Sequence, residues 1–325
     1  MISYLVRRIL YAIPILIGVN LLTFLLFFVV NSPDDMARMQ LGQKRVSEEA
    51  VLKWKQERGY DKPRLFDVDA KGIRKLTNTI FFEKSVPLFW FKFGHAEDGR
   101  DIAHEIRSRM LPSLAIALPV FIVGLLFYVT FALLMASFRA TYIDLIGVLL
   151  CIIAMSVSGL FYIIGGQYLI SKLWNLVPIS GYAEGFNAWK FLVLPVIIGI
   201  IGGVGASSRL YRTIFLEEIN RDYVRTARAK GLAEWRVLFR HVLHNAMLPI
   251  LTGVVVAIPL LFMGSLITES FFAIPGLGSY TIDAIASQDF TVVRAMVFLG
   301  SVLYIVGLML TDISYTIADP RIRLQ

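Results

Sequence analysis

The sequence predicts an all-α integral membrane protein with six transmembrane helices. Hydrophobic residues make up 57% of the 325 residues and charged residues only 17%, whereas a soluble globular chain is nearer half apolar and about a quarter charged. The mean hydropathy is +0.67. Several apolar runs also reach the roughly 20 residues that a helix needs to cross a hydrocarbon core.

The first span is expected at residues 9–30, directly after Arg7 and Arg8. A secretory signal peptide has a shorter apolar core and a small-residue cleavage site, whereas this run is long and ends in VVNSPDD. Residues 1–30 are therefore expected to form the first transmembrane helix, with the N-terminus in the cytoplasm.

Residues 31–110 form a long polar region with thirteen acidic and sixteen basic residues. It is expected to be an external (periplasmic) cap, either a solvated loop or a small folded unit, or a platform that meets an external partner. Its cations do not fix its side, because loops longer than about 60 residues contribute little to orientation. Residues 101–109 are expected to form an amphipathic helix that leads into the next span.

Residues 111–325 are expected to form a five-helix core. Its spans are predicted at about 111–137, 143–170, 189–208, 249–271 and 291–312. A loop is expected at 272–290. Gly199 and Gly203 have the small-xxx-small spacing that lets helices approach closely, so packing explains them without a functional role.

A charged elbow at 209–248 interrupts the apolar core sequence. Leu216, Ile219, Tyr223 and Ala227 follow a helical spacing, and Lys230 with Gly231 predicts a helix end. A second helical pattern follows, formed by Leu232, Trp235, Leu238, Phe239 and Val242. The elbow is therefore expected to be a helix–turn–helix.

Short loops predict the orientation of the chain. Cations concentrate at the N-terminus, at Arg139, in the elbow and in the tail, whereas residues 272–290 carry none. Lysine and arginine are enriched in cytoplasmic loops. The elbow and both termini are therefore expected in the cytoplasm.

The sequence lacks several common nucleotide-binding and catalytic motifs. It has no GxxxxGK[ST] loop for ATP, no GxSxG and no kinase motif. None of the four histidines has a metal-ligand pattern, so no metal site is expected, and Cys151 stands alone. The net charge of +8 is attributed to the cytoplasmic cation bias, and no nucleic-acid partner is expected.

The spans offer no obvious energy source. Asp144, Glu269 and Asp312 lie near predicted span ends, and Asn20 is the clearest polar residue within the first span. Ion-coupled carriers usually bury ionisable residues within the membrane. Their scarcity argues against a secondary transporter and an intramembrane protease, and it favours a partner that supplies energy.

The elbow resembles the EAA signature of the permease subunits of ABC importers. The segments that carry the resemblance are DYVRTARAKGL and HVLHNAMLP, in which Arg225, Thr226 and Ala227 take the EAA positions and Gly231 is the signature glycine. Pro249 follows eighteen residues later, the longer spacing of the peptide branch. The N-terminal ISYLVRRILYAIPILIGVNLLTF, IRSRMLPSLAIALP, Glu269 with PGLG, and the terminal DPRI are similar to the B-type subunit of dipeptide, oligopeptide and nickel importers.

The resemblance implies a subunit of an ATP-driven importer for peptides in the bacterial inner membrane. A second, homologous permease would share the translocation pathway, two ATPase subunits would dock below the two permeases, and an external solute-binding protein would deliver the substrate. The chain itself would be no enzyme and would bind no cofactor, because ATP and Mg²⁺ would bind to the ATPases. The substrate pathway residues are not assigned.

The implied contact with the ATPase is a short helix after the signature glycine, at about 232–239. Trp235 and Leu238 would be its apolar anchor, with arginine side chains at the rim. The coupling residues implied by the resemblance are Arg225, Thr226, Ala227, Arg228, Lys230, Gly231, Leu232, Ala233, Glu234, Trp235, Arg236, Leu238 and Phe239.

Other hypotheses remain open at this level. Within the family, the substrate is a peptide or, alternatively, a nickel chelate or another small solute. Outside it, the chain is an ion-coupled secondary carrier, or a receptor subunit with the 31–110 cap as ligand platform. For the elbow itself, the alternative to an ATPase contact is an amphipathic helix that lies on anionic lipid.

Overall fold

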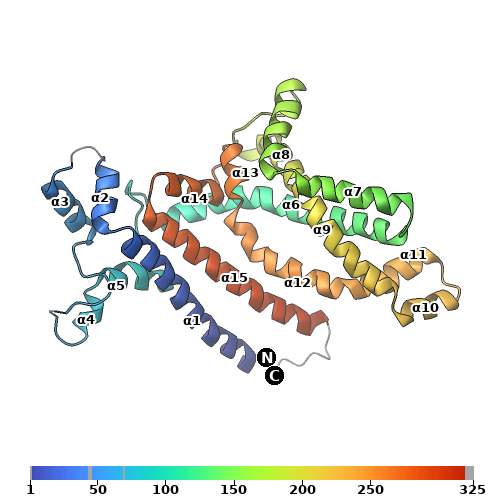
Figure 1. The fold of residues 1–325 in the computed structure, drawn as a ribbon, viewed down its shortest axis with the longest axis horizontal. Helices are drawn as coiled ribbons and strands as arrows, with labels where there is room; N and C mark the ends of the chain where they lie inside the picture. The colour runs from blue at the N-terminus through green and yellow to red at the C-terminus, as the bar shows by residue number, and fades with distance from the viewer. Residues whose placement is uncertain (1, 43–45, 69, 319–325) are drawn as a thin grey trace. The chain divides into compact units, whose positions relative to one another are not determined.

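Helices alone, and no β-strand, make up the regular secondary structure of the part described by the computed structural model, residues 2–42, 46–68 and 70–318 (Figure 1). The predicted all-α fold class is thus confirmed. The chain divides into two compact units, one of Met1–Ser108 with Thr281–Ile305 and one of Arg109–Tyr280 with Val306–Gln325.

The helices fall into the following elements. The α-helices are α1 (Ile2–Leu25), α2 (Pro33–Leu41), α3 (Glu48–Arg58), α4 (Arg74–Thr77), α5 (Ile80–Ser85), α6 (Ile102–Ser137), α7 (Tyr142–Ser156), α8 (Gly159–Gly166), α9 (Trp189–Ile219), α10 (Asp222–Ala229), α11 (Glu234–Arg236), α12 (His244–Leu260), α13 (Leu266–Phe271), α14 (Leu277–Ala286) and α15 (Phe290–Ala318). The π-helical segments are η1 (Leu26–Val30), η3 (Gln167–Leu173) and η5 (Val237–Leu243), and the 3-10 segments are η2 (Val86–Trp90), η4 (Gly185–Ala188) and η6 (Leu261–Met263).

Five helical runs among the described residues are long and apolar enough to cross a membrane. They are Val6–Val30, Ile102–Ser137, Trp189–Ile219, Glu234–Phe271 and Phe290–Ser314. Each includes one of the spans predicted from the sequence. A bent pair of helices, α7 and α8 with η3, brings the number to six if the pair counts as one span.

The third predicted span, 143–170, is wrong as a continuous helix. The chain bends by 90° between α7 and α8, where the backbones of Val157 and Ser158 are extended. The 15 residues of α7 cover only about 22 Å, less than the roughly 30 Å of a hydrocarbon core. A crossing here would therefore need both arms of the pair.

The elbow also differs from the prediction. The helix of the fourth span does not end at 208, because α9 continues to Ile219 and so includes the first part of the predicted elbow. The segment 232–239 is not a separate short helix, since the helix that begins at Glu234 runs without interruption into the fifth span. The short, separate helix of the elbow is α10, before Gly231. The expected loop at 272–290 contains a further helix, α14.

Residues 31–110 fold onto the C-terminal end of α1. Phe24 and Phe28 form the base of a buried cluster that includes Trp54, Tyr60 and Ile80 of this region. Phe24 stacks on Phe28 with ring centroids 4.8 Å apart, and Tyr60 meets Phe28 edge-on at 5.3 Å. The described residues of this region therefore form a small folded unit and not a solvated loop.

A buried arginine fastens this region to α15. Arg294 Nη2 donates to the carbonyl of Lys84 at 3.0 Å and to Ser85 Oγ at 2.7 Å, and its guanidinium lies 5.2 Å from the ring of Phe28. Asn20 Nδ2 of α1 donates to the carbonyl of Ser85 at 2.8 Å. The residues around Ser85 thus join α1 and α15, and sequence reasoning overlooked Arg294 as an ionisable residue in a span.

Close helix contacts hold the other unit together. A Cβ at Gly199 would stand 2.8 Å from Val120 of α6, and one at Gly203 would collide with Tyr128 of the same helix. The expected packing role of these two glycines is confirmed. Arg212 of α9 forms a two-pronged ion pair with Asp144 of α7, with both N–O distances 2.7 Å.

Candidate functional site

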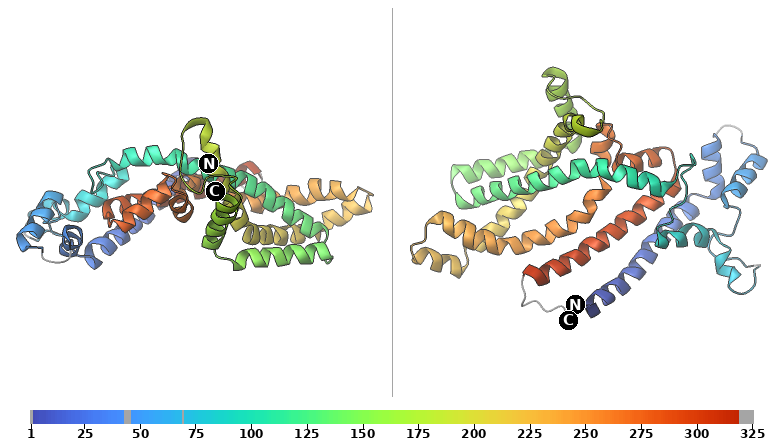
Figure 2. Two further views of the ribbon diagram at one scale, coloured as in Figure 1. Left: turned by 90° about the horizontal axis from the view of Figure 1, so that it is seen from above. Right: turned by 180° about the vertical axis from the view of Figure 1, so that it is seen from behind.

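The elbow lies at one end of α9 and α12, where α10 and α11 connect the two helices (Figure 2). It rests on a buried apolar cluster formed by Phe215 of α9, Val224 and Ala227 of α10, and Val237 and Val242 beyond the turn. Ala132, Leu133 and Ala136 of α6 complete this base. Burial of this inner face fixes the position of the outer face relative to the long helices α6, α9 and α12.

Gly231 closes α10 in the way that the sequence predicts. Its φ is +74°, a region that other residues enter only with strain. The amide of Gly231 donates to the carbonyl of Arg228 at 2.9 Å, and the amide of Leu232 donates to that of Ala227 at 3.4 Å. This pair of hydrogen bonds is the Schellman motif of a glycine-terminated helix.

The outer face of the elbow is polar and largely exposed. Arg228 of α10 pairs across the turn with Glu234, with Nε 3.1 Å from Oε2, and this pairing raises the pKa of the guanidinium. Arg225 pairs with Asp222 at 3.4 Å, and its side chain is 72% exposed. Such exposed ion pairs contribute little to stability and are easily replaced. The side chains of Arg225 and Arg228 are therefore accessible to a partner.

Two large apolar side chains interrupt this polar face. Trp235 and Phe239 are four residues apart and therefore lie on one side of the helix that begins at Glu234. They are 61% and 58% exposed, and Arg236 lies 5.2 Å from the Trp235 ring. Leu238 instead packs on the buried cluster, so the exposed apolar pair is Trp235 with Phe239 and not Trp235 with Leu238.

The remaining residues of the predicted surface divide between the two faces. Ala227 is buried, and Leu232 packs on the cluster beneath the elbow. Thr226, Lys230 and Ala233 are exposed. Most of the thirteen predicted residues are thus exposed, whereas Ala227, Leu232 and Leu238 face the cluster beneath the elbow.

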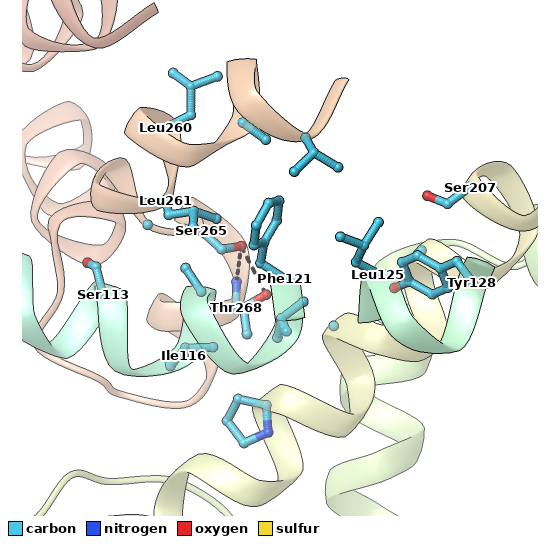
Figure 3. A pocket seen from close by; sticks show the side chains of 18 of the residues that line it. Ser113, Ile116, Phe121, Leu125, Tyr128, Ser207, Leu260, Leu261, Ser265 and Thr268 are labelled. Carbon is cyan, nitrogen blue, oxygen red and sulfur yellow. Dashed lines mark hydrogen bonds between the residues drawn. The ribbon is translucent and has the colours of Figure 1, made fainter. Parts of the chain in front are cut away.

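A second feature is a cavity of about 500 Å³ between α6, α9, α12 and α13 (Figure 3). Its wall is mostly apolar, with Phe121, Leu125 and Leu261 among the lining side chains. Ser113, Ser265, Thr268 and Glu269 supply oxygen atoms at one end, and Tyr128, Ser207 and Tyr211 do so elsewhere. The Ser265 and Thr268 hydroxyls lie 3.0 Å apart in a hydrogen bond.

Glu269 is the buried carboxylate at the edge of this cavity, only 1% exposed. It accepts hydrogen bonds from the backbone amides of Ser265 at 3.1 Å, Gly278 at 2.7 Å and Ser279 at 3.1 Å. Ser113 Oγ of α6 accepts the amide of Leu277 at 2.7 Å. The carboxylate thus satisfies amides at the N-terminus of α14, where a negative charge is favourable.

The two glycines of the PGLG turn, Gly276 and Gly278, stand where a larger residue would not fit. A Cβ at Gly276 would collide with the Glu269 carboxylate, and one at Gly278 would stand 2.6 Å from the backbone of Ser265. The signal for this arrangement in the sequence is Glu269, an isolated acidic residue shortly before the glycine-rich PGLG turn. It did not indicate that the two meet.

Comparisons with known proteins cover nearly the whole chain. The family model described as "Binding-protein-dependent transport system inner membrane component" matches residues 105–324, and the model for the N-terminal part of such components matches residues 1–70. The chain is 29% identical to the oligopeptide transport system permease protein AppB of Bacillus subtilis and 28% identical to the dipeptide transport system permease protein DppB of Escherichia coli, in each case over 99% of both chains. A relative from Brucella abortus is 31% identical, again over 99% of both chains.

Proposed function

The chain belongs to the family of binding-protein-dependent transport system inner membrane components, and we propose that it is a permease subunit of an ATP-driven importer for peptides. Two relatives that match over their full length are named for oligopeptide and dipeptide transport, which supports a peptide substrate. The family is a multi-pass membrane component of a transport system and not a catalytic subunit. ATP and Mg²⁺ would accordingly bind to separate ATPase subunits, and the chain would reside in the bacterial inner membrane.

The observation that carries this proposal is the exposed apolar pair on the elbow. Trp235 and Phe239 are large, rigid side chains exposed on a helix end whose inner face is fixed by a buried cluster. Aromatic side chains of this kind form the centres of protein interfaces, where each contributes about 2 kcal/mol or more. We propose that they enter a groove of the ATPase, so that movement of the ATPase is transmitted to α9 and α12.

The charged residues would surround this apolar centre. Arg225, Arg228 and Arg236 form a cationic rim on α10 and α11. Cations at an interface rim improve encounter rate and register more than affinity. A groove with carboxylates at its edge is therefore the complementary surface, and it would contact α10 as well as the start of the following helix.

The cavity between α6, α9, α12 and α13 is proposed as the share of the translocation pathway that this chain contributes. Its apolar wall with scattered hydroxyl groups suits passage of varied side chains, because it offers hydrogen bonds while the carboxylate of Glu269 at its edge is engaged by backbone amides. A second permease of similar fold would supply the other wall, and an external binding protein would deliver the peptide.

Removal of the apolar pair tests the docking role. The importer is reconstituted in liposomes with its second permease, ATPases and binding protein, and Trp235→Ala and Phe239→Ala are compared with the parent. Each truncation is expected to weaken association with the ATPase by about 2 kcal/mol, a roughly thirty-fold loss of affinity. Peptide uptake per ATP hydrolysed should fall accordingly.

The matched control is Trp174→Ala. Trp174 is 60% exposed, but it follows η3 and lies outside the elbow, so its removal should leave ATPase association unchanged. Normal association of both elbow variants would refute the docking role. Transport by the chain alone in vesicles with an ion gradient would instead support an ion-coupled carrier.

A further inference from the structure

The loop between α3 and α5, described at residues 63–68 and 70–77, has a fixed conformation. Asp67 is buried, and its carboxylate accepts hydrogen bonds from Asn78 Nδ2 at 2.8 Å and from the amide of Ala70 at 3.3 Å. The amide of Asp67 donates to the carbonyl of Lys75 at 2.9 Å. These bonds hold the two sides of the 63–77 loop together.

This loop directs its apolar side chains outward. Val68 and Ile73 are 76% and 78% exposed, and Phe66 and Leu76 are 50% and 58% exposed. Several large apolar side chains exposed in one short segment are unusual on a water-facing surface and point to a contact with protein or membrane. Since hydrogen bonds fix the loop in this conformation, the outward direction of these side chains points to a covering surface.

Cations are interspersed among these apolar side chains. Lys71 and Arg74 are exposed, and Lys75 Nζ lies 5.7 Å from the centre of the Phe66 ring. An apolar face with lysine and arginine at its edge is typical of segments that lie in the headgroup region of a bilayer. The cations pair with phosphates while the apolar groups reach the acyl boundary.

The depth of α5 places this loop beside the membrane span. The end of α5 is bound through the Ser85 carbonyl to Asn20, which lies ten residues before Val30, the last residue of the first span. Ten helical residues correspond to about 15 Å. Phe81 of α5 also meets Phe24 of α1 edge-on at 5.1 Å. The helix α5 therefore packs against apolar turns of a transmembrane segment.

The loop is joined directly to the start of α5. The amides of Ile80 and Phe81 donate to the carbonyls of Pro63 and Arg64, each at 3.0 Å. Figure 1 shows α5 beside α1 and α4 next to α5, with α2 and α3 beyond the end of α1. Trp90, which is 68% exposed, follows α5, and tryptophan is enriched at membrane–water boundaries.

We propose that the 63–77 loop is inserted into the headgroup layer of the bilayer at the surface where α1 ends. Phe66, Val68, Ile73 and Leu76 contact the acyl boundary, and Lys71 and Arg74 bind lipid phosphates. Because the adjoining α5 packs on apolar turns of the first span, lipid is at hand to cover these side chains. The inference requires that the chain spans a membrane and does not depend on the transported substrate.

Site-directed fluorescence in lipid nanodiscs tests this proposal on the full-length chain alone. Val68→Cys and Ile73→Cys are made in a Cys151→Ala background and labelled with an environment-sensitive dye. Emission at both positions is expected to shift to the blue, to be quenched by lipids with a nitroxide near the headgroup, and to lose quenching by aqueous iodide. Because both parent side chains are exposed, these substitutions remove no buried contact.

The matched control is Leu52→Cys on α3. Leu52 is 54% exposed in the same folded region, and a dye there should be quenched by iodide and not by the lipid nitroxide. The shift at position 68 should increase with anionic lipid, and Lys71→Gln with Arg74→Gln should abolish this increase. Iodide quenching at 68 and 73 equal to that at 52 would overturn the proposal. Shielding from iodide without quenching by the lipid nitroxide would overturn it too, because another part of the protein would then cover the loop.

Discussion

Gly231 ends α10 in a left-handed conformation that an L-residue adopts with strain. No heavy atom lies within 4 Å of the position where a Cβ would stand, so Gly231→Ala changes the backbone energy and not the packing. We expect it to destabilise the turn by about 1–2 kcal/mol. In hydrogen exchange on the full-length protein, the amides of residues 231 and 232 should exchange faster, because their hydrogen bonds close the turn.

Gly202→Ala is the matched control for this change. Gly202 also has open space where a Cβ would stand, but it lies within α9, and alanine is favoured over glycine in a helix by about 1 kcal/mol. Exchange around position 202 should therefore stay the same or slow down. Equal exchange at 231 and 232 in Gly231→Ala and the parent would contradict the role of backbone strain.

Local residue patterns were predictable from the sequence, and long-range pairs were not. A cation followed by glycine predicts a helix end at Gly231 because the capping bonds join neighbours in the chain. Glu269 binds amides of α14 as well as that of its own N-cap Ser265, and the partners of Arg294 lie up to 210 residues away. Only the fold brings such groups together, so their residue types gave no indication of their contacts.

At the scale of elements, Glu269 fixes α14 relative to α13. Glu269→Gln replaces a carboxylate oxygen with an NH₂ group that cannot accept from a backbone amide. At least one buried amide, of Ser265 or of the pair Gly278 and Ser279, then loses its acceptor, which costs about 1–3 kcal/mol. The buried thiol of Cys151 reports the loss, because a thiol-reactive dye should label it at a lower temperature during unfolding.

Glu217→Gln provides the comparison. Glu217 is exposed on α9, and the same chemical change at a surface site usually alters stability by less than about 0.5 kcal/mol. If both variants unfolded at the temperature of the parent, the hydrogen bonds of Glu269 would have no net stabilising role.

The positions of the spans followed from composition, but the breaks and ends of the helices did not. The 90° bend between α7 and α8 falls where Ser158 is followed by Gly159, a turn signal that was overlooked because the surrounding residues are apolar and no proline is present. The charged residues after 208 predicted the end of a span, whereas α9 continues to Ile219 because Phe215 packs in the buried cluster. Tertiary packing thus determines where these helices end.

At the scale of the whole molecule, the proposal requires the elbow and the 31–110 region to face opposite sides of the membrane. Three membrane segments separate them along the chain, namely α6, the bent pair α7 and α8, and α9. An odd number of crossings brings the chain to the other side. Opposite placement therefore requires that the bent pair crosses the membrane, and a pair that returned to its own side would place both regions together.

Cysteine labelling in intact cells distinguishes these topologies. Arg225→Cys in the elbow and Leu52→Cys in α3, each in a Cys151→Ala background, replace exposed side chains. The cations of the elbow predict a cytoplasmic position, so a membrane-impermeant maleimide should label position 52 in intact cells and position 225 only after lysis. Labelling of both positions in intact cells would mean that the bent pair does not cross, and labelling of 225 alone would reverse the orientation. The expected pattern would place the elbow on the side where ATP is available, as docking of an ATPase at Trp235 and Phe239 requires.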